Sequence, residues 1–306
     1  MKFKIIILTF IIFIVCSCFS NLIFAAEKNT LDIIDNLDLQ INNNIDVWNN
    51  PELNIKLWKN KLNKALENNE TKLIAEANKN LGLAYSYVTN YDKAFEHYLT
   101  AIKIYMQKNM LLETAEIYND IGFIYKKMRN FDKSLEYLKN ALQIYKENNN
   151  ETGIAQSYTY IGNVFYHLNN FTEAKNYFEL ALNIYNKMPI IIKNITFPLN
   201  NLGTIYLLQN DIDKALDYFL RAYQISLKIQ SKWDIANSLN NLGAAYTQKN
   251  NFDSAVYCLK KSLELSLQLN AKDLQLDTYK FFNTLYLKKG DRLNYLENYK
   301  AYSDLK

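Results

Sequence analysis

Apolar side chains recur in this sequence with the period of an amphipathic helix, and the pattern as a whole returns about every forty residues. Five segments share the order Leu or Ile, Gly, two further residues, and Tyr or Phe; they lie at 80–85, 120–125, 160–165, 201–206 and 241–246. A sixth, altered copy has Asn283 in the place of glycine and Tyr286 three residues later. A polar break and a second amphipathic stretch follow each copy. Each unit is therefore predicted to be a helix, a turn and a helix.

The glycines of these five segments predict close contact between the two helices of a unit. A glycine inside a helix costs about 1 kcal/mol relative to alanine. Because five glycines occupy the same position of their repeats, packing must offset this cost in each repeat. Small residues recur 12 and 19 positions after each glycine: Ala94, Ser134, Ala174, Ala215, Ala255, and Ala101, Ala141, Ala181, Ala222, Ser262. Bulky residues recur 16 positions after it, where we expect them to fill the gap between neighbouring repeats: Tyr98, Leu138, Phe178, Phe219 and Leu259.

The polar breaks carry residues that begin helices. Asparagine and aspartate side chains accept hydrogen bonds from the first free amides of a helix. We predict such turn and N-cap roles for Asn90, Asn130, Asn170 and Asn250, with Asp92, Asp132, Asp213 and Asp253.

This order of large and small residues closely resembles the tetratricopeptide repeat. The resemblance covers about residues 70–306, although the period is forty rather than thirty-four and the proline that usually closes each repeat is missing. In this respect the sequence is similar to the long-helix members of the family, such as kinesin light chains. The resemblance implies an all-α fold, a right-handed superhelical solenoid of antiparallel helix pairs.

The pattern also predicts how the chain is divided. Residues 51–68 have the apolar spacing of one capping helix, so 51–306 would form a solenoid with five clear repeats and a degenerate C-terminal one. In that last repeat the small positions become Tyr295 and Tyr302. This suits a final helix that no repeat covers, or a face for self-association.

The resemblance further implies a binding groove. In tetratricopeptide folds the face of the first helix opposite the core lines the concave surface, and here that face carries the positions 6 and 2 before each glycine and 1 and 5 after it. These positions are Glu76, Asn80, Leu83, Tyr87, Glu116, Asp120, Phe123, Lys127, Gln156, Tyr160, Asn163, His167, Phe197, Asn201, Thr204, Leu208, Asn237, Asn241, Ala244 and Gln248.

The N-terminal half of this predicted groove is acidic and aromatic, and its C-terminal half is mostly neutral amides. An asparagine amide both donates and accepts hydrogen bonds, so a row of them could hold an extended peptide segment of a protein partner. Any positive charge on that peptide is expected near Glu76, Glu116 and Asp120. The alternative is that these asparagines are solvated positions filled by composition, because the whole chain is rich in Asn.

Charge and composition narrow the function classes. The formal net charge is +4, and no run of Lys or Arg forms a stripe for a phosphate backbone, so no nucleic-acid partner is predicted. The two histidines, His97 and His167, do not belong to a cluster with metal-ligand spacing, and the glycines do not form a phosphate loop. We predict a scaffold that is not an enzyme and needs no metal or cofactor. A module for envelope glycans, using Tyr87, Phe123 and Tyr160, is the alternative.

The segment 1–26 has the form of a secretion signal. Lys2 and Lys4 precede an apolar run from Ile5 to Val15, and a small pair follows at Ala25 and Ala26. Three outcomes are open: cleavage after this pair, lipidation of Cys18 within a segment that resembles a bacterial lipoprotein box, or retention as a membrane anchor. The protein is expected to be exported, whether periplasmic, secreted or attached to the envelope, with residues 27–50 as a spacer.

One irregularity interrupts the repeat. The spacing from Gly162 to Gly203 is longer by one position than the other spacings, and it coincides with an aliphatic run at 188–198 where other repeats have a polar turn. This run is expected to pack against its neighbours or, alternatively, to contact a partner.

Overall fold

A computed structural model describes residues 51–188 and 193–306 of the protein. Within these residues the secondary structure is helical, with thirteen α-helices, one short 3-10 helix and no strand. The α-helices are α2 (Pro51–Glu67), α3 (Thr71–Tyr87), α4 (Tyr91–Gln107), α5 (Leu111–Lys127), α6 (Phe131–Glu147), α7 (Glu151–His167), α8 (Phe171–Tyr185), α9 (Thr196–Leu208), α10 (Ile212–Lys228), α11 (Lys232–Gln248), α12 (Phe252–Gln268), α13 (Lys272–Lys289) and α14 (Arg292–Leu305). The predicted signal, Cys18 and the predicted spacer lie outside the described residues.

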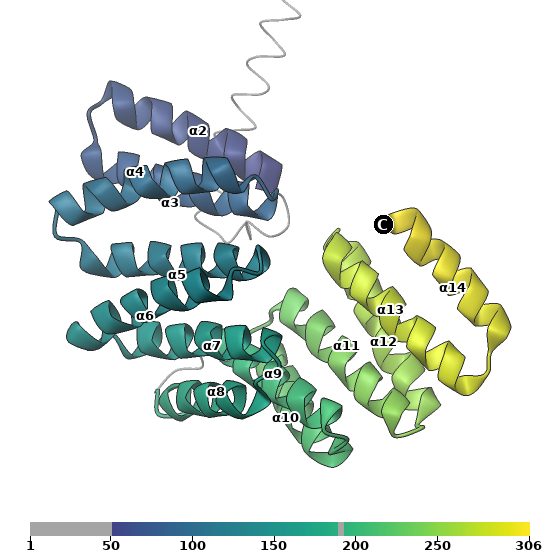
Figure 1. The fold of residues 1–306 in the computed structure, drawn as a ribbon. Coiled ribbons are helices and arrows are strands. Elements are labelled where there is room, and N and C mark those ends of the chain that lie inside the picture. The colour runs from purple at the N-terminus through teal and green to yellow at the C-terminus, as the bar shows by residue number, and fades with distance from the viewer. Residues whose placement is uncertain (1–50, 189–192) are drawn as a thin grey trace, which may run out of the picture.

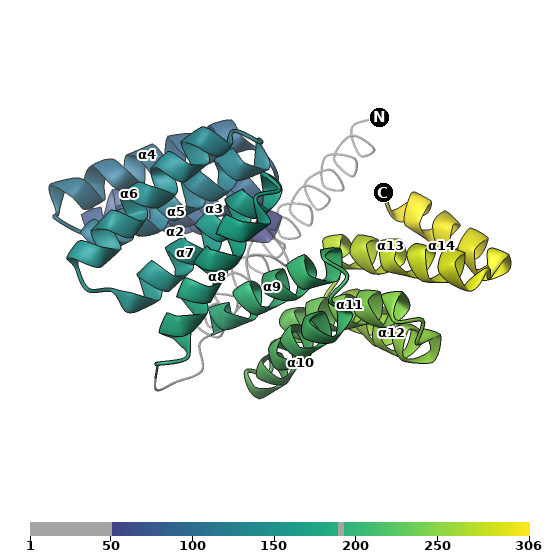
Figure 2. The same ribbon diagram turned by 60° about the horizontal axis from the view of Figure 1, so that its bottom comes forward.

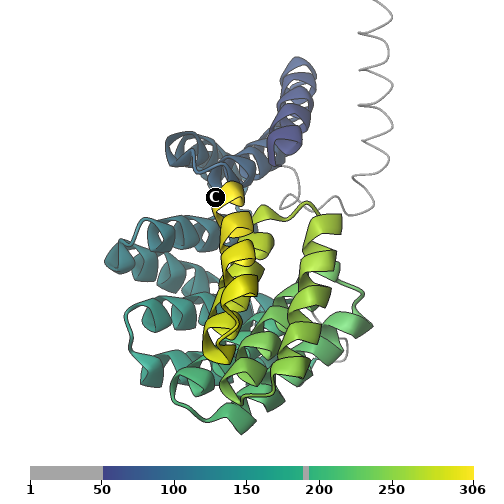
Figure 3. The same ribbon diagram turned by 90° about the vertical axis from the view of Figure 1, so that its right-hand side faces the viewer.

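The helices pack as consecutive antiparallel pairs, from α3 with α4 to α13 with α14, and α2 packs against α3. Figure 1 shows the pairs stacked along a curved path, with α2 and α14 at its two ends. Successive first helices of the pairs, α3, α5, α7, α9, α11 and α13, contact one another, and Figure 2 shows α9 and α11 on the inner side of the curve. The view along the side in Figure 3 shows how far the C-terminal pairs have turned relative to α2. The predicted all-α solenoid is confirmed.

The contact between glycine and bulky residue is the structural basis of each pair. A Cβ atom added to Gly82 would lie 2.6 Å from the ring of Tyr98 on the next helix, and one added to Gly162 would lie 2.8 Å from Phe178. The other three bulky residues stand in the same relation to their glycines. All five are at most 1% exposed, and the ten small residues beside them are fully buried. The bulky side chain therefore lies over the glycine of its own pair, which only a residue without Cβ permits.

Asparagine and aspartate begin most of the second helices. The side chain of Asn90 accepts a hydrogen bond from the backbone amide of Lys93. In the same way, the side chains of Asn130 and Asn170 each accept one from the backbone amide three residues later in the sequence. The prediction for Asn250 is wrong: the N-cap of α12 is Asn251, whose side chain accepts from the amide of Ser254. The N-caps follow their glycines by eight residues, and the extra residue before Gly203 displaces this register by one.

The four predicted aspartates lie in the first turns of their helices and do not supply the caps. They are Asp92, Asp132, Asp213 and Asp253. The cap of α10 is Asp211, whose side chain accepts from the amide of Lys214. A negative charge in the first turn still stabilises a helix, because the free amides there carry partial positive charge.

Asn250 instead belongs to a second set of asparagines that end helices. Its φ is 61°, in the left-handed region that asparagine tolerates better than most residues. Ten residues other than glycine have this conformation in the described chain, about one for every helix, and seven are asparagine. Part of the asparagine content, these seven residues, therefore serves the turns.

The aliphatic run at 188–198 follows α8 and includes the first three residues of α9, and its residues 189–192 lie outside the described part. Its described residues include Ile195 and Pro198, which are buried, and Met188, which is half-buried. Ile195 packs in the same core cluster as Phe178 and Leu202, which agrees with packing as the role of this end of the run. Among the helices that the structure describes, none combines the length and apolar character needed to cross a bilayer.

Candidate peptide-binding groove

The twenty predicted groove residues all lie on the first helices α3, α5, α7, α9 and α11, and each is half-buried or exposed. Because these helices contact one another along the inner side of the solenoid, their shared face forms one continuous surface. The α3–α5–α7 part of this surface carries most of its charge and aromatic rings, and the α9–α11 part carries most of its amides.

Four asparagine amides of α7, α9 and α11 have no partner among the residues that the structure describes. The side chains of Asn163, Asn201, Asn237 and Asn241 are half-buried, and none makes a side-chain hydrogen bond within this part of the chain. Asn80 differs, because its Nδ2 donates to the backbone oxygen of Glu76 at 2.9 Å. The row of free amides therefore runs from α7 to α11 and does not extend to α3.

Asp120 occupies the middle of the N-terminal part. Its carboxylate accepts a hydrogen bond from the hydroxyl of Tyr98, at 3.2 Å, which reaches it from beneath the groove on α4. Burial raises the pKa of Asp120 to about 7, because desolvation disfavours the charged form, although Lys79 and the Tyr98 hydrogen bond act in the opposite direction. The carboxyl group thus titrates near neutral pH.

The charge of this carboxylate acts on two tyrosines of neighbouring helices. Burial and the charge of Asp120 raise the pKa of Tyr87 on α3 far above its ordinary value, and raise the pKa of Tyr160 on α7 to about 12. Gln156 donates a hydrogen bond to the hydroxyl of Tyr160 at 3.1 Å. Tyr87, Asp120 and Tyr160, from three helices, therefore lie close enough for the charge of Asp120 to act on both tyrosines.

The acidic character of this half is weaker than a count of its carboxylates indicates. Lys79 lies 2.7 Å from Glu116 and forms an ion pair with it across α3 and α5. Lys126, which the pattern does not assign to the groove, has its ammonium 4.4 Å from the centre of the Phe123 ring, and Lys127 lies 5.4 Å from the same ring. Burial, and then the charge of Lys127, lower the pKa of Lys126 to about 8.

Phe123 also contacts Tyr160, with ring centres 6.3 Å apart. His167 lies exposed at the end of α7, where partial burial and the charges of Lys126, Arg129 and Lys127 lower its pKa. Across α5 the groove therefore changes from acidic, at Glu116 and Asp120, to basic at its C-terminal end.

The sequence pattern did not predict three buried asparagine side chains on the first helices. Asn119, Asn200 and Asn240 each precede a repeat glycine by three residues and are at most 6% exposed. Ser157 donates to Asn119 at 3.1 Å, whereas both amide atoms of Asn240 are buried without a partner among the described residues. The sequence could have indicated them, because asparagine stands three residues before the glycine in three of the five repeats.

His97 is also more constrained than its position on a second helix indicates. Its Nδ1 lies 2.8 Å from Oδ1 of Asn78, and its ring stacks on Tyr85 with centres 5.4 Å apart.

Over residues 51–188 and 193–306, no group of His, Cys, Asp and Glu side chains has an arrangement that could hold a metal ion.

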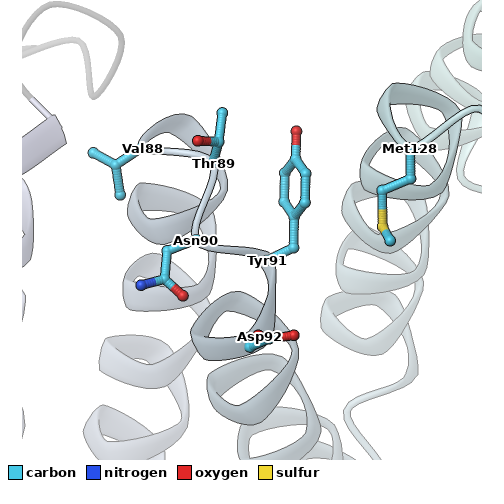
Figure 4. A pocket seen from close by; sticks show the side chains of 6 residues that line it. All are labelled: Val88, Thr89, Asn90, Tyr91, Asp92 and Met128. Carbon is cyan, nitrogen blue, oxygen red and sulfur yellow. The ribbon is translucent and has the colours of Figure 1, made fainter.

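One hollow of the surface lies away from this groove. It has a volume of about 420 Å³ and is formed by the turn between α3 and α4 together with Met128 at the end of α5, as Figure 4 shows. Turn residues line it, and Met128 is half exposed there.

The sequence matches the tetratricopeptide repeat family over residues 113–187 and 196–268, just under half of the chain. No curated protein shows significant sequence similarity to it. Solved structures with a similar fold include BtubC from P. vanneervenii, with a TM-score of 0.57 and 21% sequence identity; the match covers 72% of this chain and 92% of BtubC. Another is the apo form of RapI, with a TM-score of 0.62 and 20% identity; the match covers 76% of this chain and 82% of RapI. A third is the Rap conjugation gene regulator of the plasmid pLS20 in complex with the Phr* peptide, with a TM-score of 0.60 and 19% identity; the match covers 72% of this chain and 60% of the regulator.

Proposed function

Taking as premise that the chain is a protein of the tetratricopeptide-repeat type, we propose that it is a non-catalytic interaction scaffold that holds an extended peptide segment of a protein partner in its concave groove. The observation that carries the proposal is the row of half-buried amides at Asn163, Asn201, Asn237 and Asn241, none of which is bonded within the described chain. A peptide backbone presents amides and carbonyls at regular intervals, which such side chains can pair with.

Two further features support this proposal. A structure of the same fold holds a peptide, the pLS20 regulator with its Phr* peptide. The groove also continues across five helix pairs, which matches the length of an extended segment better than the form of a compact ligand.

Binding of a random acetylated hexapeptide mixture to the immobilised protein tests the proposal. The double variant Asn201→Ala/Asn241→Ala should retain about tenfold less peptide, because each lost hydrogen bond to a peptide backbone contributes about 0.5–1.5 kcal/mol. Asn176→Ala/Asn183→Ala, which changes two exposed residues of α8, is the matched control and should bind as the wild type does. Equal retention by all three proteins would contradict a peptide site in this groove.

The glycan alternative has less support from the same surface. A sugar stacks on an open aromatic face, but the ammonium of Lys126 lies over the ring of Phe123, and Tyr160 packs beside that ring. Retention of the protein on envelope polysaccharide, lost on replacing Tyr87, Phe123 and Tyr160 with alanine, would reverse this preference.

Self-association through α14 is a second candidate with an observation of its own. Leu293, Leu296 and Tyr299 are 69%, 54% and 50% exposed, and Tyr299 stands at the phase where the other five repeats bury their bulky residue. Sedimentation analysis of the wild type and of Leu293→Ser/Leu296→Ser tests it. A dimer that the variant abolishes would place the contact on α14, and a monomeric wild type would exclude it.

Export remains part of the proposal. It is supported by the basic start and the apolar run of the segment 1–26. The mass of the protein after expression in a bacterial host separates the outcomes: an N-terminus at Ala26 or Glu27 indicates ordinary cleavage, a lipid on Cys18 indicates a lipoprotein, and an intact chain in the membrane fraction indicates an anchor.

A further inference from the structure

The carboxylate of Asp120 lacks a counter-charge in direct contact within the described structure. It is half-buried on α5, and its one hydrogen bond comes from the neutral hydroxyl of Tyr98 at 3.2 Å. A desolvated carboxylate without a cationic partner is costly, and proteins satisfy such groups with a cation or leave them partly protonated.

The nearest lysine is already occupied. The Nζ of Lys79 lies 2.7 Å from the carboxylate of Glu116, four residues before Asp120 on α5, and its charge reaches Asp120 without a direct ion pair. The other lysines of this region, Lys126 and Lys127, lie at the C-terminal end of α5 with their ammonium groups against the ring of Phe123. The charge of Lys79 therefore offsets that of Asp120 only in part, and no cation of the described residues contacts the carboxylate directly.

We propose that Asp120 receives one positively charged nitrogen group of the bound peptide, either a guanidinium or ammonium side chain or the N-terminal ammonium. This inference rests on the proposed function, and it assigns one ionic contact to the α3–α5–α7 part of the groove. Glu116 is excluded as the main contact, because Lys79 already neutralises it.

The rings beside Asp120 favour a cation of this kind. The charge of Asp120 acts on Tyr87 of α3 and on Tyr160 of α7, so two aromatic side chains lie in its neighbourhood, and aromatic rings attract ammonium and guanidinium groups. The same surface already shows this preference, because the ammonium of Lys126 lies 4.4 Å from the centre of the Phe123 ring.

The contact should depend on pH. The titratable groups whose charges act on Asp120 are Lys79 and Tyr87 on α3, Tyr98 on α4, Glu116 on α5, Tyr145 on α6 and Tyr160 on α7. Burial raises the pKa of each of these four tyrosines, so they stay neutral. Burial alone would lower the pKa of Lys79, but the charge and hydrogen bond of Glu116 raise it, so Lys79 stays charged. Asp120 alone titrates near 7, so the contact is complete above this pH and is lost below it.

The test uses the full-length protein and three synthetic hexapeptide mixtures that contain no Lys and no further Arg. The first is acetylated with one fixed arginine, the second has citrulline in its place, and the third has citrulline and a free N-terminus. Citrulline keeps the size of arginine without its charge, and the third mixture separates the two sources of positive charge. Wild type, Asp120→Asn and Glu136→Gln are compared at pH 8 and pH 6, the last being a control on the exposed face of α6.

At pH 8 the wild type should retain one of the two cationic mixtures about tenfold better than acetylated citrulline, because hydrogen bonds to charged groups are the stronger ones. This preference should decline at pH 6, be absent in Asp120→Asn and persist in Glu136→Gln. A preference that survives in Asp120→Asn, or a wild type without any preference, overturns the inference.

Two results separate this inference from the proposed function. If the wild type retains all three mixtures equally and Asn201→Ala/Asn241→Ala loses them, the groove binds peptide and the role of Asp120 is wrong. If no mixture is retained by any protein, both the proposed function and this inference are wrong.

Discussion

Gly203 of α9 and Phe219 of α10 pack so closely that a Cβ atom on the glycine would come within 2.5 Å of the ring. The same relation recurs in the four other glycine-containing repeats, and it allows the backbone of one helix to rest on a large side chain of the next. The five glycines are therefore part of the core rather than of the turns.

Gly203→Ala should destabilise the protein by about 1–3 kcal/mol, because the strain of overpacking exceeds the gain in helix propensity of about 1 kcal/mol. Thermal or urea unfolding measures the change. In the double variant with Phe219→Ala the penalty of the alanine should disappear, because the ring that it meets is gone. Additive effects of the two substitutions would show that the contact does not limit packing.

Asp120→Asn should stabilise the protein at pH 8 by about 1–3 kcal/mol, because it removes a desolvated charge. The folded pKa of Asp120 is raised to about 7, so the folded state binds the extra proton and the wild type regains this stability as pH falls from 7 towards 4. The difference between the two proteins should therefore shrink over that range. A difference that is the same at pH 8 and pH 4.5 in urea unfolding would contradict the assigned burial; Glu136→Gln is the control.

Asn240→Leu should leave stability unchanged or raise it by about 1 kcal/mol, because both buried amide atoms of Asn240 lack a partner in the described structure. Asn119→Leu should instead cost about 1–2 kcal/mol, because it leaves the buried hydroxyl of Ser157 without its acceptor. Both residues are 1% exposed and occupy the same phase of their repeats. Equal losses in the two variants would show that Asn240 has a partner in solution, such as an ordered water.

Asn250 and Asn251 should tolerate different replacements, glycine at Asn250 and aspartate at Asn251, although alanine is unfavourable at both. Asn250→Gly should be neutral or stabilising, since glycine adopts φ near 60° without strain, whereas Asn250→Ala should cost about 1 kcal/mol. Asn251→Ala should also cost about 1 kcal/mol through loss of the N-cap, while Asn251→Asp should be tolerated. The same pattern at both positions in thermal melts would mean that the two roles are not separated as described.

Within one repeat, the sequence determines most of the local structure. A glycine at one phase, with small and bulky residues at fixed distances after it, specifies which faces of two helices meet, because only one register lets Tyr98 or Phe219 fit over a backbone without Cβ. The same periodicity placed the groove face on the first helices, since residues that share a phase share a side of the helix.

Only the tertiary structure decided the chemistry of the groove, because it depends on which side chains of neighbouring repeats reach one another. Counting residues made Glu116 and Asp120 equivalent acids, yet Lys79 pairs with one and leaves the other desolvated beside Tyr98. Lys126, one residue from a predicted groove position, turns onto Phe123, and Asn80 bonds to its own helix while Asn201 and Asn241 stay free within the described chain. Spacing along a helix fixes the direction of a side chain, whereas the environment of an acid such as Glu116 or Asp120 depends on side chains of other helices, 37 residues away at Lys79 and 22 residues away at Tyr98.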